Sequence, residues 1–165
     1  METNDYTKMI RKIASREAFI ATGIALTIDC IILIVATLTD DSMFAIESRT
    51  LWIPIIFAIA LLVFGQLLAK RTAVLISRKP HIWWLAGPIC AAVTLFIAVS
   101  ICSSLFFINE AIVNFNIDLF WMDLAVFTLG IPAGILIYSS PFLLAHGLWF
   151  GYRISNRIKN LHVEV

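Results

Sequence analysis

Four long apolar stretches restrict what this chain can fold into. They cover about residues 18–38, 51–69, 84–108 and 124–150. A helix needs roughly 20 mainly apolar residues to cross about 30 Å of hydrocarbon, and the four stretches meet that length. Inside a bilayer the backbone must satisfy its own hydrogen bonds, which a helix of this length does. The sequence therefore predicts an all-α polytopic membrane protein, a bundle of four transmembrane helices.

The composition excludes an ordinary soluble domain. Hydrophobic residues make up 61% of the 165 residues, charged residues 14%, and the mean hydropathy is +0.93. Globular proteins are nearer half apolar and about a quarter charged. We divide the chain into an amphipathic cytoplasmic segment (1–17), the transmembrane domain (18–150) and a basic cytoplasmic tail (151–165).

The two ends of this division are expected to be helical. The N-terminal segment is predicted to form an interfacial helix, with Met9, Ile10 and Ile13 facing lipid and its basic residues reaching the headgroups. The tail is predicted to continue the fourth helix, with Ile154 and Ile158 on one face.

The basic residues indicate how the chain is oriented. Eleven of the twelve lysines and arginines fall in the N-terminal segment, the second connection and the tail, and only Arg49 falls elsewhere. Such residues are retained on the cytoplasmic side. All five tryptophans also lie at predicted membrane boundaries, which their amphipathic rings prefer. We predict a multi-pass protein of the cell inner membrane with both termini cytoplasmic.

Asp29 is the one charged residue deep inside a predicted span. A charge at that depth costs a few kcal/mol on insertion scales, roughly 2.5–3.5, so ionisable groups there are candidates for function. Counting depth from the opposite direction places polar groups of two other spans at the same level. Together they form the predicted intramembrane polar layer: Asp29, Thr94, Tyr138, Ser139 and Ser140. Two interpretations stay open, a layer that holds the helices in register and a site that binds a proton or ligand.

Two further features lie in the second and fourth spans. Gln66 and His146 are at similar depth near the cytoplasmic boundary, and we expect an inner-leaflet polar pair between them. The fourth span carries two GxxxG patterns, Gly130 with Gly134 and Gly147 with Gly151, which let backbones approach closely. It also carries Pro132 and Pro141, which predict kinks because proline removes a backbone donor.

Several function classes have no support in the residues. No nucleotide-binding, metalloprotease, dithiol or serine-hydrolase motif occurs, and the three histidines are dispersed, so we expect no catalytic residues, metal or cofactor. The three cysteines lie inside apolar runs, as small buried hydrophobes do. The basic residues border the membrane, so we expect contact with the lipid bilayer and not with nucleic acid.

The leading hypothesis is an accessory, regulatory, immunity or exclusion protein that recognises another membrane protein or itself by helix–helix contact. It rests on small size, the absence of catalytic motifs, outer connections too short to fold alone, and the glycine-rich fourth span. The alternative is a small oligomeric proton-coupled transporter or channel that uses Asp29.

Overall fold

The computed structural model describes residues 3–38, 52–113 and 120–163, and the side chains of 5–28, 30–31, 52–109 and 120–160. Throughout these residues the secondary structure is helical, apart from the single residue Lys79. The elements are α1 (Thr3–Leu38), α2 (Trp52–Arg78), the 3₁₀ turn η3 (Pro80–Ile82), α3 (Trp83–Val113), α4 (Phe120–Ala125), the π-helical turn η4 (Val126–Gly130) and α5 (Ile131–Val163).

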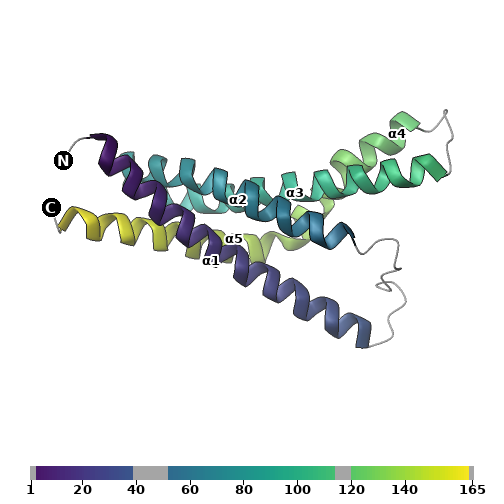
Figure 1. Ribbon diagram of the computed structural model, residues 1–165, viewed down its shortest axis with the longest axis horizontal. Coiled ribbons are helices and arrows are strands. Elements are labelled where there is room, and N and C mark those ends of the chain that lie inside the picture. Colours follow the sequence, from purple (N-terminus) through teal and green to yellow (C-terminus); the bar gives the residue numbers. More distant parts are fainter. Residues whose placement is uncertain (1–2, 39–51, 114–119, 164–165) are drawn as a thin grey trace.

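The long helices run in alternating directions, so that the start of α1 and the end of α5 lie at the same end of the molecule (Figure 1). We call this the basic end, because it carries the cations of α1, of the end of α2 and of α5. Three helical stretches among the described residues are long and apolar enough to cross a membrane: Trp52–Arg78, Pro80–Asn109 and Phe120–Asn160. The all-helical prediction is confirmed to this extent.

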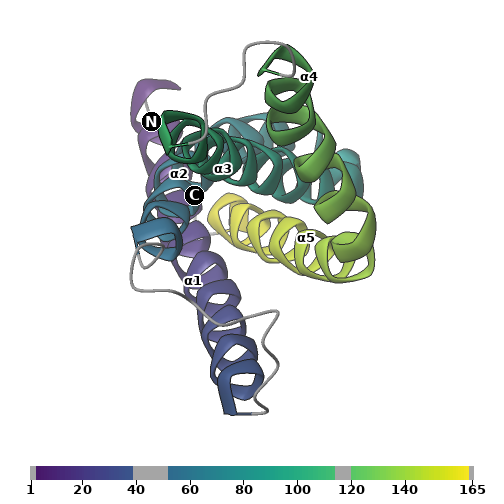
Figure 2. The ribbon, with the colours of Figure 1, turned by 90° about the vertical axis from the view of Figure 1, so that its right-hand side faces the viewer.

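The helices pack most tightly toward the basic end and separate toward the other. Figures 1 and 2 both show the second half of α1 and the α4 segment on opposite sides of the far end. The core at the basic end takes buried residues from all four long helices, many of them alanines. These core residues are Ile10, Ala14, Ala18, Ala21, Ala69, Ala73, Ile76, Ala86, Cys90, Phe150, Ile154 and Ile158.

Alanines three and four residues apart explain why α1 packs closely here. Ala14, Ala18 and Ala21 follow Ile10 on one face of the helix, because residues three and four apart are neighbours on its surface. Ile10 is only 2% exposed, so the expectation that it faces lipid is wrong. The reason is that α1 continues from Thr3 to Leu38, and Ile10 lies on the face of its first turns that joins the core.

The helices α3 and α5 cross at three glycines. A Cβ placed on Gly147 would lie 2.6 Å from the backbone nitrogen of Pro88, and one on Gly87 would lie 3.0 Å from the Cα of Gly151. Real Cβ atoms rarely approach other atoms so closely. Gly147 and Gly151 of the second GxxxG pattern therefore lie where α5 meets α3 backbone to backbone.

A π-helical turn, η4, lies directly before the segment with Pro132, where the sequence predicts a kink. At η4 the N–H of Ile131 donates to the carbonyl of Val126, five residues before it, as in a π-helix. In the same pattern the Phe127 carbonyl would accept a hydrogen bond from the N–H of residue 132, which proline lacks. Ser103 of α3 lies 2.5 Å from the Phe127 carbonyl and can donate to it, while Ser104 lies 3.3 Å from the Thr128 hydroxyl. Ser103 thus offers a donor to a backbone carbonyl of the irregular turn, and Ser104 adds a side-chain contact between α3 and the turn. α5 continues unbroken through Pro141.

Substitution of Gly147 tests the crossing. Gly147→Ala is expected to lower the free energy of unfolding by about 1–3 kcal/mol, because the methyl group meets the Pro88 backbone. Gly134→Ala is the matched control, since a Cβ there has nothing within 4 Å, and its expected change is within about 0.5 kcal/mol. Reversible unfolding in mixed micelles measures both. Equal stability of the two variants would contradict the close crossing.

Candidate functional site

A buried ion cluster joins the first and last long helices. Glu17 of α1 is 3% exposed, and the Nε atom of Arg153 of α5 lies 2.7 Å from its Oε2. Nη2 of Arg153 donates to Oε1 over 3.3 Å, and Nε of Arg157 lies 3.7 Å from the same Oε1. The Nε–Oε2 contact is close but its geometry is not that of a hydrogen bond, so attraction between the charges holds it.

The two arginines come from successive turns of α5, four residues apart on one face. Arg153 is one-third exposed and Arg157 about half, so both reach water while their inner nitrogens face Glu17. Arg153 also lies over the Trp149 ring, with its Cζ 5.0 Å from the ring centroid. A guanidinium held by a carboxylate and an aromatic face is well positioned.

Glu17 was missed in the sequence reading because it lies among basic residues. The signal was present, however. Glu17 follows Ile10 and Ala14 by seven and three residues, so it lies on the apolar face of α1. A carboxylate on that face requires cations from another helix. The tail of the chain supplies them.

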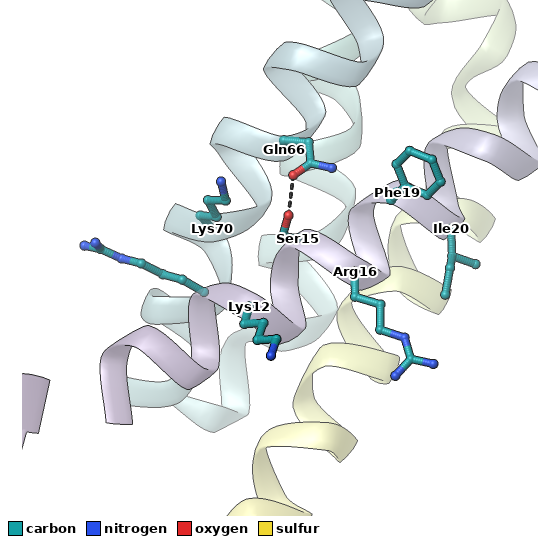
Figure 3. Close-up of a pocket in the computed structure, with 8 residues that line it drawn as sticks. Lys12, Ser15, Arg16, Phe19, Ile20, Gln66 and Lys70 are labelled. Atoms are coloured by element: carbon teal, nitrogen blue, oxygen red, sulfur yellow. Dashed lines mark hydrogen bonds between the residues drawn. The ribbon is translucent and has the colours of Figure 1, made fainter. Parts of the chain in front are cut away.

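The predicted inner-leaflet pair is not formed. Gln66 of α2 instead accepts a hydrogen bond from Ser15 of α1 (Figure 3). His146 is half-buried and lies against Trp149 of its own helix, with ring centroids 5.9 Å apart. Equal depth was the basis of the prediction, and depth says nothing of which face a side chain occupies. Gln66 thus links α2 to α1, whereas His146 contacts Trp149 within α5.

The described members of the predicted polar layer form no hydrogen bonds with one another. Thr94 is buried, close to Gly65 of α2, and donates to the Cys90 carbonyl over 2.7 Å. Ser139 donates to the Ile135 carbonyl of its own helix over 2.6 Å, and Ser140 is exposed. Asp29 lies in α1, and its side chain is outside the described ones. Its role, and the transporter alternative built on it, stay predictions.

Tyr138 does not face the other helices of the chain. Its side chain is 88% exposed. It precedes Gly147 by nine residues, which at about 100° per residue turns it half a circle away from the crossing with α3. Tyr138 is therefore not packed against the described residues of the other helices, and its place in a polar layer with Asp29 stays a prediction. Gly134, one turn before Tyr138, also points to open space, since nothing lies within 4 Å of a Cβ placed there.

The described residues contain no group of three histidine, cysteine, aspartate or glutamate side chains able to hold a metal ion. Comparison with protein-family models, curated proteins and solved structures finds no match. Three features of the structure bear on function: the ion cluster, the outward face of α5, and a basic cleft at the α1–α2 junction.

A double-mutant cycle tests the ion cluster. Arg153→Gln is expected to cost about 2–3 kcal/mol of unfolding free energy, because it leaves the buried Glu17 carboxylate underpaired. Glu17→Gln should cost less, since both arginines reach water. The double variant should be more stable than Arg153→Gln alone. Strictly additive losses, measured by reversible unfolding in mixed micelles, would contradict the pairing.

Proposed function

We propose that this chain is a non-enzymatic, four-span protein of the cell inner membrane with both termini in the cytoplasm, acting by helix–helix contact with another membrane protein. Three apolar helical stretches and the same-end placement of α1's start and α5's end support the topology (Figure 1). The first span is assigned to residues 18–38 of α1. The basic end is assigned to the cytoplasm, because eleven of twelve lysines and arginines belong to it.

The observation that carries the proposal is the outward face of α5, which we call the Tyr138 face. Gly134, Tyr138 and Phe142 follow one another at four-residue spacing, so they share one side of α5, and Gly130 lies four residues before Gly134 as the last residue of η4. Tyr138 is 88% and Phe142 78% exposed. The face therefore combines small residues, a large ring and a phenol.

Polar groups on this face favour a protein neighbour over lipid. A phenolic hydroxyl near the middle of a span finds no hydrogen-bonding partner among acyl chains. Pro141 has no N–H to donate to the carbonyl of Ile137, the residue before Tyr138, so this helix offers another polar group at the same depth. Leaving such groups unpaired in an apolar medium costs roughly 2–7 kcal/mol each. A second helix with polar side chains relieves that cost.

The glycines favour close approach of that second helix. Small residues four apart let two backbones come together, and packing with interhelical hydrogen bonds drives association in lipid. The Gly147–Gly151 pattern is already occupied by α3. The Gly130–Gly134 pattern has only Val126 of its own segment near it, at 3.7 Å from Gly130. It is available for a partner.

Site-specific photo-crosslinking tests the partner. p-Benzoylphenylalanine at Tyr138 in intact cells is expected to give one discrete protein adduct heavier than the chain alone. Ile59 of α2, which is 55% exposed, is the matched control position and is expected to give no discrete protein adduct. Gly134→Leu should abolish the adduct at position 138. Gly23→Leu should not, although Gly23 is equally open.

Two results would contradict this proposal. Identical adducts from positions 138 and 59 would show unspecific neighbours. A single adduct of twice the chain's mass would replace the separate partner with a second copy of this chain.

A further inference from the structure

A wide, open cleft of about 840 Å³ lies at the junction of α1 and α2 near the basic end. Figure 3 shows that Gln66 and Lys70 come from α2, and that the other labelled residues come from α1. The hydrogen bond between Ser15 and Gln66 joins the two helices within it. The cleft is therefore held by a fixed contact between two helices.

Four cations line this cleft: Arg11, Lys12, Arg16 and Lys70. None forms an ion pair with a carboxylate of the described residues. Glu17, the nearest acid in sequence, is on another face of α1 and is held by Arg153. Asp5 pairs with Lys8. Among the described residues, the four positive charges of the cleft thus have no compensating carboxylate.

The lining changes from charged to apolar along α1. Arg11 and Lys12 come first, Ser15 and Arg16 follow one turn later, and Phe19 and Ile20 follow after another turn. At 1.5 Å per residue the step from Lys12 to Ile20 is about 12 Å along the axis. Phe19 is 62% exposed. The headgroup layer on each side of a bilayer is roughly 5–8 Å thick, so this step passes from headgroups into hydrocarbon.

We propose that this cleft binds one anionic phospholipid of the cytoplasmic leaflet. The cations hold the phosphate headgroup, and an acyl chain lies along Phe19 and Ile20. A soluble anion would leave the apolar half of the cleft, Phe19 and Ile20, without a contact. An acidic protein segment would not match a cleft that opens toward the hydrocarbon of the bilayer. Basic pockets between membrane helices on the cytoplasmic side bind such headgroups. The proposal needs membrane insertion but not the Tyr138 face, so the two fail separately.

Native mass spectrometry of the delipidated full chain in detergent tests the site. Phosphatidylglycerol is expected to bind at a saturable one-to-one ratio, and phosphatidylcholine at least about tenfold more weakly. Arg16→Gln with Lys70→Gln should weaken phosphatidylglycerol binding about 30-fold, since each cation near the surface contributes roughly fivefold. Arg78→Gln with Lys79→Gln removes the same charge from exposed positions of the basic end outside the cleft, and should leave binding within about threefold.

Three outcomes would overturn the assignment. An equal loss of phosphatidylglycerol binding in both double variants would show general electrostatic attraction to the basic end instead of a site in the cleft. Binding of phosphatidylcholine as tight as that of phosphatidylglycerol would show that the net charge of the headgroup plays no part. Displacement of the lipid by an equal concentration of inorganic phosphate would assign the cleft to a soluble anion. All four substituted residues are at least partly exposed, and matching elution and unfolding midpoints verify that each variant is folded.

Discussion

The rest of the structure depends on the ion cluster of Glu17 with Arg153 and Arg157. A carboxylate that is 3% exposed is costly unless it is paired, and its partners lie 136 and 140 positions further along the chain. The cluster therefore fixes the first helix against the last at the basic end. That contact aligns the alanine face of α1 with the core and holds the end of α5 where its glycines meet α3.

One consequence is a molecule with two different ends. At the basic end, small residues and the ion cluster bring all four long helices together. Toward the other end α1 and α4 separate (Figure 2). There the π-helical turn before Pro132 is contacted by two serines of α3. The exposed groups divide in the same way. The cationic cleft belongs to the basic end, and the Tyr138 face lies along the middle of α5.

The sequence predicted the helices well because length and apolarity alone determine them. It also predicted that the tail continues the last span, and α5 does run to Val163 with Ile154 and Ile158 buried. It did not predict which face each residue occupies. Tyr138 and Gln66 were assigned partners by depth, whereas rotation about the helix axis decides contacts. Glu17 was concealed among cations, although its spacing from Ile10 and Ala14 placed it on the packed face.

The central claim is a four-span chain whose basic end is cytoplasmic, and cysteine labelling tests it most directly. In a cysteine-free background, single cysteines replace Asp5, Ser42, Asn116 and Asn160, and intact cells are treated with a membrane-impermeant maleimide. The account predicts labelling at positions 42 and 116 in intact cells, and at 5 and 160 only after the membrane is permeabilised. Labelling of position 5 or 160 in intact cells, or protection of position 42 while 116 is labelled, would contradict it.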